Sequence, residues 1–176
     1  MYKRQVYPYI REALKGWNKE VIIASKSYAY TYKMMQDAVE EARQALNRDK
    51  IEIFMLHEME SPANVRGHWP AMEYLQEAKA KNIVGASGIS THAVGGVQAA
   101  LEHDEIEVLH PMLNQAGLGL IDGTIEELLP LLESCHQVGK GIYAMKVLGG
   151  GHLLQQAQQA ITWAAQLPLS LIHILK

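Results

Sequence analysis

The segment EVIIASKS, residues 20–27, joins a short apolar run to a charged side chain. Residues 21–25 are small or apolar, and branched side chains such as these pack well on a pleated sheet, so the sequence predicts a buried strand. Lys26 follows directly. An ammonium group at the end of a buried strand either reaches water or points toward a ligand. The residues at the ends of the other predicted strands help to decide between these two possibilities.

Apolar segments alternate with amphipathic segments along the whole chain. The predicted strands cover residues 20–25, 51–59, 83–91, 106–113 and 141–151. The predicted helices cover residues 7–17, 31–49, 70–82, 92–104, 124–140 and 152–167. The strands begin about 30 residues apart on average, which is the length of a βαβ unit. Repeated units of this kind predict a parallel sheet with helices packed outside it.

Two architectures fit five such units. One is an open doubly wound sheet, and the other is part of an eight-stranded barrel. A complete barrel takes roughly 250 residues, whereas this chain has 176. If the fold is a barrel, we therefore expect an incomplete one whose outer strands, 20–25 and 141–148, expose their edges or are covered by the terminal tails.

Composition excludes several classes of partner. The net charge of −3 gives no electrostatic reason to expect nucleic acid or an anionic membrane. No apolar run approaches the roughly 20 residues that cross a bilayer, and we expect no membrane partner. The single cysteine, Cys135, can form neither an internal disulfide nor a metal cluster, which favours the cytoplasm. The histidines lack metal-ligand spacing, so no metal site is predicted.

Polar residues gather where the predicted strands end. These are Lys26, His57, Ser90 to His92, His110 to Asn114, and Lys146 to Gly151. Taken singly, a lysine or histidine at a strand end is more often solvated or structural than functional. Chemistry in parallel α/β folds lies at the carboxyl ends of the strands, and the recurrence of polar residues there predicts a ligand-binding rim.

Five segments resemble the aldo-keto reductases in order and spacing. They are VIIASKS, DKIEIFMLHEM, GISTH, HPMLN and MKVLGGGHL. The resemblance runs from about residue 6 to residue 167. Within the family, the segments are most similar to a bacterial branch that often carries a 4Fe-4S tail. It implies a (β/α)8 TIM barrel of which these strands are the third to seventh. It also implies reduction of aldehydes or ketones to alcohols with NADP or NAD as cofactor.

The resemblance assigns roles to particular positions. Lys26 matches the lysine that lowers the pKa of the family's proton-donating tyrosine, and His57 matches the histidine that orients the carbonyl. Other positions match the family's cofactor-binding residues; these are Ser90, Thr91, His110, Asn114, Met145, Lys146, Leu148, Gly149 and Gly150.

The sequence also departs from the family pattern. The family's aspartate has no counterpart upstream, and cysteines for a 4Fe-4S cluster are absent. Tyr2 lies 24 residues before Lys26, close to the usual separation, whereas Tyr7 and Tyr9 are interpreted as packing residues. Residues 1–5 and 169–176 look like translated sequencing adapters, so we interpret 6–168 as a single partial barrel domain. Tyr2 is discounted accordingly, and the chain itself is expected to be inactive.

Two other interpretations stay open. The chain is alternatively a non-catalytic α/β module whose rim binds a metabolite or a partner. In the other alternative it is a barrel lyase in which Lys26 forms a Schiff base. The reductase interpretation specifically predicts that Lys26 and His57 lie on neighbouring strands, with Ser90 and Asn114 at the same rim.

Overall fold

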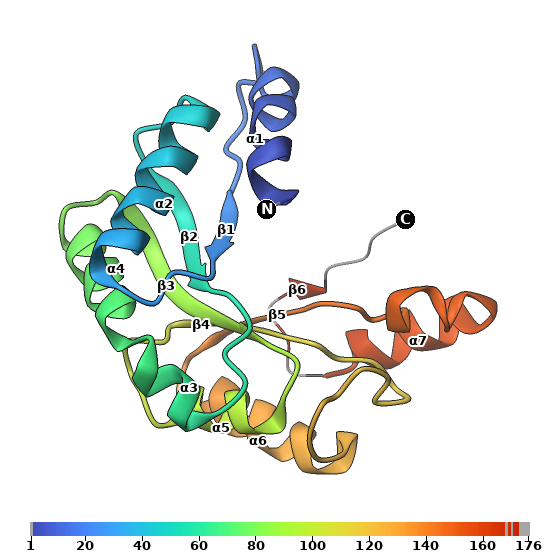
Figure 1. Ribbon diagram of the computed structural model, residues 1–176. Coiled ribbons are helices and arrows are strands. Elements are labelled where there is room, and N and C mark those ends of the chain that lie inside the picture. The colour runs from blue at the N-terminus through green and yellow to red at the C-terminus, as the bar shows by residue number, and fades with distance from the viewer. Residues whose placement is uncertain (1, 168, 170, 173–176) are drawn as a thin grey trace.

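The structure is a computed structural model that describes residues 2–167, 169, 171 and 172. Its strands form one parallel sheet in which the order in space follows the order in sequence (Figure 1). The strands are β1 (Ala24–Ser27), β2 (Ile51–Leu56), β3 (Val84–Thr91), β4 (Val108–Pro111), β5 (Gly141–Ala144) and β6 (Leu171–Ile172). A doubly wound sheet reverses its order at a switch point, whereas a barrel does not. The sequential order therefore matches part of a (β/α)8 barrel.

The helices are α1 (Tyr2–Ala13), α2 (Tyr32–Leu46), α3 (Pro62–Gly67), α4 (Trp69–Ala80), α5 (Val94–Leu101), α6 (Ile125–Gln137) and α7 (Ala157–Ala165). Helices α2 to α6 cover one face of the curved sheet, whereas α1 packs against α2 and α7 stands apart from the other helices (Figure 1). Two 3-10 turns, η1 (Gly149–Gly151) and η2 (Leu154–Gln156), precede α7. Side-chain caps fix where two of these helices begin. At the start of α2 the side chain of Thr31 accepts the Met34 N–H, and at the start of α6 Thr124 forms a capping box with Glu127.

The outer strands differ from the sequence expectations. The predicted strand at 21–25 is wrong in its start, because β1 begins at Ala24 and Ile22 is 66% exposed. The reason is that β1 pairs with β2 alone in the described sheet and buries one face, so Ile23 and Ser25 are buried while Ala24 is exposed.

The far side of the sheet ends in β6. Among the described strands no pairing joins β1 to β6, so the sheet stays open as expected. Leu171 and Ile172 pair with Tyr143 and Ala144 of β5, although they lie in the segment predicted to be an adapter-like tail. The edge of β5 is thus covered by a terminal segment, and the foreign origin of that segment stays a prediction.

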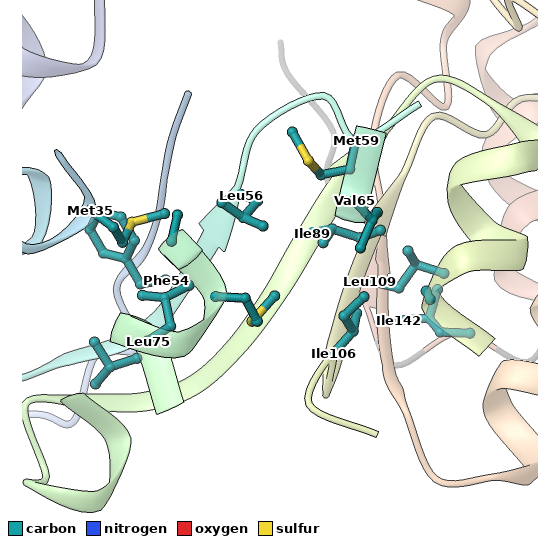
Figure 2. Close-up of a cluster of buried hydrophobic side chains, with 14 of the residues drawn as sticks. Met35, Phe54, Leu56, Met59, Val65, Leu75, Ile89, Ile106, Leu109 and Ile142 are labelled. Carbon is teal, nitrogen blue, oxygen red and sulfur yellow. The ribbon is translucent and has the colours of Figure 1, made fainter. Parts of the chain in front are cut away.

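The apolar core lies between the sheet and its helices (Figure 2). Leu56, Ile89, Leu109 and Ile142 occupy one row of paired positions across four strands, and all four are fully buried. Successive residues of a strand face opposite sides of the sheet. The neighbouring row, which begins with Lys26 opposite Met55, therefore faces away from the helices. This inner face carries Lys26, His57, Ser90 and His110 at the carboxyl ends of β1 to β4.

Candidate active site

Lys26 and His57 lie at the carboxyl ends of neighbouring parallel strands. Lys26 is paired with Met55, and His57 follows two residues later, on the same inner face. The His57 N–H donates to the carbonyl oxygen of Ser27 at 2.9 Å, which fixes the residue beside β1. The structure thus brings together the two positions that the sequence suggested as catalytic.

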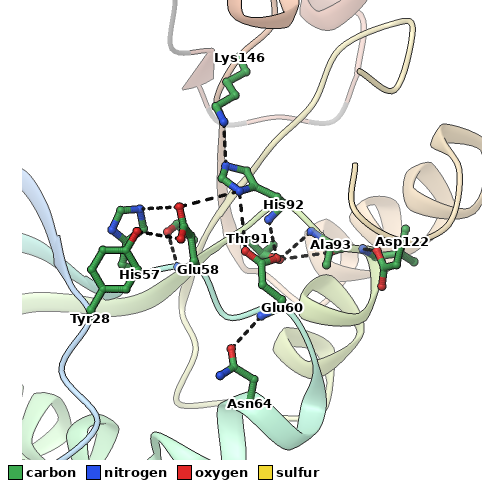
Figure 3. Close-up of polar contacts among 12 residues, drawn as sticks. Tyr28, His57, Glu58, Glu60, Asn64, Thr91, His92, Ala93, Asp122 and Lys146 are labelled. Atoms are coloured by element: carbon green, nitrogen blue, oxygen red, sulfur yellow. Dashed lines mark hydrogen bonds and ion pairs between the residues drawn. The ribbon is translucent and has the colours of Figure 1, made fainter. Parts of the chain in front are cut away.

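Glu58 occupies the centre of this rim (Figure 3). Its carboxylate accepts a 2.7 Å hydrogen bond from the Tyr28 hydroxyl, and its other oxygen lies 3.5 Å from His57 Nε2. The Tyr28 ring stacks on the imidazole of His57 with 4.2 Å between centroids. Glu58 has a φ of 59°, in the left-handed region, and its N–H donates to Ser90 Oγ at 3.1 Å. Left-handed backbone in a residue other than glycine costs about 1–3 kcal/mol and is often found at functional sites.

His92 and Lys146 extend the rim across the sheet. The Nδ1 atom of His92 lies 4.0 Å from Glu58 Oε1 and 3.8 Å from Glu60 Oε1, and its Nε2 lies 3.0 Å from Lys146 Nζ (Figure 3). Lys146 also has left-handed backbone, with a φ of 60°. Loops that follow β1, β2, β3 and β5 therefore contribute charged or hydrogen-bonding groups to one cluster. We call Lys26, Tyr28, His57, Glu58, His92 and Lys146 the rim cluster.

Burial and charge shift the proton affinities in the rim cluster. Burial lowers the pKa of Lys26 to about 8, with Glu58 opposing the change and Lys146 adding to it. Burial, and then the charge of Lys146, lower the pKa of His92. Burial, followed by the hydrogen bond to Glu58, raises the pKa of Tyr28 to about 12. A neutral amine at Lys26 is thus accessible near neutral pH, while Tyr28 keeps its proton.

The tyrosines weighed from the sequence lie elsewhere. The hydroxyl of Tyr7 lies 2.6 Å from Ser25 Oγ, and Ser25 faces the side of β1 opposite to Lys26. Tyr9 is 75% exposed on α1. The side chain of Tyr2 lies outside the described residues. Tyr28, two residues after Lys26, is the described tyrosine in contact with Glu58 and His57.

Ser90 and Thr91 support the loops of the rim. Ser90 is fully buried and accepts the Glu58 N–H. Thr91 Oγ1 accepts the N–H of Ala93 at 3.0 Å and donates to Glu60 Oε2 at 3.0 Å. Alternation places Thr91 on the helix side of β3, at the start of α5. In this structure both hydroxyls therefore hold the loops after β2 and β3, and their contact with a cofactor stays a prediction.

His110 and Asn114 also make hydrogen bonds within the protein. His110 Nδ1 lies 2.6 Å from the carbonyl oxygen of Tyr143, and the two rings stack at 3.8 Å. Asn114 is fully buried; its Oδ1 accepts the N–H groups of Ala116 and Leu118, and its Nδ2 donates to the Leu118 carbonyl. The amide of Asn114 shapes its own turn, so the structure does not bring it into the rim cluster.

The glycine-rich loop after β5 lies next to Lys146. Gly149 and Gly150 have φ values of 58° and 66°, and a side chain on Gly150 would meet nothing within 4 Å. Met145, which precedes Lys146, is buried and bridged to Met112, and Leu148 leads into η1. Gly150 is exposed, whereas Gly149 is buried and donates its N–H to the carbonyl oxygen of Lys146 at 2.7 Å. Exposed left-handed glycine backbone, as at Gly150, suits an anionic ligand such as a phosphate.

Sequence reasoning singled out neither Tyr28 nor Glu58 as a site residue. A usable signal was present, because Tyr28 follows Lys26 by two residues and therefore shares its face if the strand continues. Glu58 gave no such signal. It is adjacent to His57 and reaches the rim through left-handed backbone, which a strand pattern does not reveal.

Other kinds of site are not evident in the described part of the chain. Among the described residues no group of three His, Cys, Asp or Glu side chains is arranged to hold a metal ion. No described helix is long and apolar enough to span a bilayer. Two surface hollows lie away from Lys26 and His57. One is lined by residues of α1 and of the end of α2, and the other by glutamines around Trp163.

The sequence and the fold were compared with known proteins. Residues 1–166 match the family model described as Aldo/keto reductase family. A search among curated proteins finds no match. Among solved structures, the chain superposes on the holo form of aldo-keto reductase AKR11C1 from Bacillus halodurans with a TM-score of 0.78 at 15% identity, covering 97% of this chain and 68% of that one.

Two further structures have the same fold. MGS-M4, an aldo-keto reductase enzyme from a Medee basin deep-sea metagenome library, gives a TM-score of 0.73 at 14% identity, with 96% of this chain and 66% of that one covered. The glycerol dehydrogenase AKR11B4 from Gluconobacter oxydans gives 0.64 at 17% identity, with 84% and 47% covered. The chain thus spans about two thirds of the first two structures and less than half of the third.

Proposed function

Because this chain belongs to the aldo/keto reductase family, we propose that it carries the catalytic rim of an NAD(P)H-dependent enzyme that reduces aldehydes or ketones to alcohols. The observation that supports this most is the convergence of Lys26, His57 and Glu58 at the carboxyl ends of β1 and β2. A cytoplasmic location is part of the same proposal and rests on the single free cysteine, Cys135, which is buried.

In this proposal Lys26 and His57 act on the substrate carbonyl. The imidazole of His57 donates a hydrogen bond to the carbonyl oxygen and so polarises the bond, and Tyr28 restricts its ring by stacking. The ammonium form of Lys26 favours negative charge as it develops on that oxygen. Glu58 balances the positive charge of Lys26 between turnovers.

Two groups of residues relate differently to the cofactor. Lys146 and the exposed backbone of Gly150 are assigned to the phosphate end, because an ammonium group and left-handed glycine backbone both suit an anion; Gly149 is buried and donates its N–H to the carbonyl oxygen of Lys146. When bound, the nicotinamide supplies the hydride. The hydrogen bonds of Ser90 and Asn114 are made within the protein, so a contact of either side chain with the cofactor requires an exchange of partners.

We further propose that the 176-residue chain does not itself turn over carbonyl substrates. Tyr28, the tyrosine stacked on His57, donates a hydrogen bond to Glu58, and its pKa is raised rather than lowered. A general acid placed and tuned for its task contributes typically 10²–10⁴-fold to rate. In this arrangement the hydroxyl is directed to a carboxylate instead of a substrate.

The test is NADPH oxidation that depends on an added aldehyde. We expect none above background for the 176-residue chain. We expect activity from a longer chain that supplies the remaining third of the relatives' length. In that longer chain, Lys26→Met and His57→Gln should each lower kcat/KM by about 100-fold or more.

Two results would contradict the proposal. A longer chain that reduces aldehydes equally well with either substitution would remove Lys26 and His57 from catalysis. A longer chain that binds NADPH without any turnover would instead favour the non-catalytic binding module. Exposed Lys33, on α2, provides the matched control, because Lys33→Met should leave kcat/KM unchanged.

A further inference from the structure

His92 lies where the loops that follow β2, β3, β4 and β5 meet. Its N–H donates to Glu60 Oε2 at 2.9 Å, and its carbonyl oxygen accepts the N–H of Ile121 at 3.2 Å. Its side chain is 18% exposed and lies between Lys146 and the carboxylate of Glu58 (Figure 3). Two neighbouring loops therefore fix the backbone of His92, and its ring lies between a cation and negative charge.

The partners of the ring determine where its proton lies. A charged ammonium group has only donors, so the Nε2 atom of His92, 3.0 Å from Lys146 Nζ, is the acceptor. A neutral imidazole that accepts at Nε2 carries its proton on Nδ1. That atom lies 3.8 Å from Glu60 Oε1 and 4.0 Å from Glu58 Oε1. We propose that His92 is a positioning residue, which as the Nδ1–H tautomer holds the ammonium group of Lys146 in place for an anionic ligand.

The contact with His92 orders a side chain that is otherwise exposed. The backbone of Lys146 is left-handed, and its carbonyl oxygen accepts the Gly149 N–H at 2.7 Å. An unconstrained lysine side chain loses rotamer freedom when it binds a ligand, and this loss weakens binding. The hydrogen bond to His92 places Nζ in advance, in the same loop as the exposed backbone of Gly150. The anionic ligand is the cofactor phosphate, so this part of the inference rests on the proposed function.

The hydrogen bond between His92 and Lys146 depends on pH. Protonation of Nε2 replaces the acceptor with an N–H bond and a positive charge, which repel the ammonium group. Burial, and then Lys146, lower the pKa of His92, while Glu60 and Glu58 oppose the change and Lys26 adds to it. We therefore expect the hydrogen bond at neutral pH, and it should be lost as the pH falls through the lowered pKa of His92.

The first experiment is ¹⁵N NMR of the histidine rings in the full 176-residue chain at pH 7, assigned with His92→Asn. We expect the Nδ1–H tautomer at His92. In Lys146→Met the pKa of His92 should rise toward the ordinary value of 6.5, because the neighbouring cation is gone, whereas Lys33→Met, on exposed α2, should leave it unchanged. An Nε2–H tautomer at His92, or a pKa indifferent to Lys146→Met, would overturn the inference.

The second experiment compares two isosteric variants of His92. The side-chain amide of His92→Gln reaches the place of Nε2 and can accept from Lys146, whereas that of His92→Asn reaches only the place of Nδ1. Pyrophosphate is titrated into each chain, and the backbone amide signal of Gly150 is followed by NMR. We expect His92→Gln to bind within about twofold of the wild type and His92→Asn to bind about fivefold more weakly. His136→Asn, exposed on α6, is the control and should bind as the wild type does.

The outcomes separate this inference from the proposed function. Equal affinity of the wild type, His92→Gln and His92→Asn, in chains that circular dichroism shows to be folded, would overturn the positioning role of His92. A wild-type chain that shows the Nδ1–H tautomer but binds no pyrophosphate would overturn the assignment of Lys146 to phosphate. The tautomer measurement uses no nicotinamide and no carbonyl substrate, so failure of carbonyl reduction would leave its result unaffected.

Discussion

Two buried or half-buried lysines lie at opposite ends of the sheet. Lys140 precedes β5 at the amino end; it is 6% exposed, and its ammonium donates to the carbonyl oxygens of His103 and Ile106 at 2.8 and 2.9 Å. Lys26 lies at the carboxyl end of β1, where burial lowers its pKa to about 8. The chemistry of a buried lysine is therefore set by the groups around it and not by burial alone.

This difference separates the amino end of the sheet from the end where the proposed active site lies. At the amino end, carbonyl acceptors compensate the ammonium group for the water that it loses. At the carboxyl end, Lys26 and Lys146 act on each other as like charges, and Glu58 and Lys146 both have left-handed backbone. Arrangements of this kind lower stability, and proteins retain them where they serve a function.

The largest effect is expected at the amino end. Lys140→Met should lower the free energy of unfolding by about 2–4 kcal/mol, because it removes two hydrogen bonds and leaves the carbonyl of buried Ile106 without this donor, while the carbonyl of His103 keeps the N–H of Ile106. Urea denaturation measures this. Lys50→Met is the control, since partly exposed Lys50 makes only an exposed hydrogen bond to the Asn82 side chain and should change stability by less than about 0.5 kcal/mol. Equal changes in the free energy of unfolding for the two substitutions would contradict the structural role given to Lys140.

Lys26→Met should change the free energy of unfolding in the opposite direction. The folded-state pKa of about 8 lies below the ordinary 10.5, so the unfolded chain binds more protons between these values and wild-type stability rises with pH across that window. Below pH 8 the free-energy penalty of keeping Lys26 charged in its half-buried position is fully present. At pH 7 the substitution should therefore raise the free energy of unfolding by about 1–3 kcal/mol. The gain should shrink as pH approaches 10.5, and a loss of stability at pH 7 would contradict the account.

Lys146→Met should have a smaller effect, exerted through Lys26. Removing this cation should raise the pKa of Lys26 and stabilise the fold by less than about 1 kcal/mol at pH 7. An NMR titration of the Lys26 side chain reports the change. A lower pKa of Lys26 in this variant would show that the two ammonium groups do not repel each other.

Tyr28→Phe should have the smallest effect. The variant keeps the ring stacked on His57 and removes an exposed hydrogen bond to Glu58, so we expect a loss of about 0.5 kcal/mol in urea denaturation. A loss above about 2 kcal/mol would show instead that this hydrogen bond stabilises the rim as strongly as a buried contact.

The parallel sheet was predictable, but the residue at which its outer strand β1 begins was not. Alternating segments and strand-to-strand spacing indicated βαβ units, and the sequential strand order then separated the barrel from the doubly wound sheet. The predicted strand start was wrong at residues 21–23. An apolar run in a central strand cannot be told from one that precedes an outer strand by sequence alone. Ile22 is exposed, since β1 has one neighbouring strand in the described sheet.

The site was predictable only where a residue lies directly at a strand end. Lys26 and His57 follow apolar runs, and the parallel register brings them to the same rim. Glu58 was missed because its role depends on a left-handed backbone and on Tyr28 from the neighbouring segment. Asn114 matches a family position, yet its amide is used within its own turn, which spacing along the chain does not reveal.

The central claim is that the carboxyl end of the sheet holds Lys26 in a state unlike that of an ordinary lysine. An NMR titration of the Lys26 side chain in ¹³C-lysine-labelled protein, assigned with Lys26→Arg, measures this directly. The account predicts a midpoint near pH 8, caused by burial and by Lys146. A midpoint at the ordinary value of 10.5 would contradict it, and with it the distinction between the two ends of the sheet.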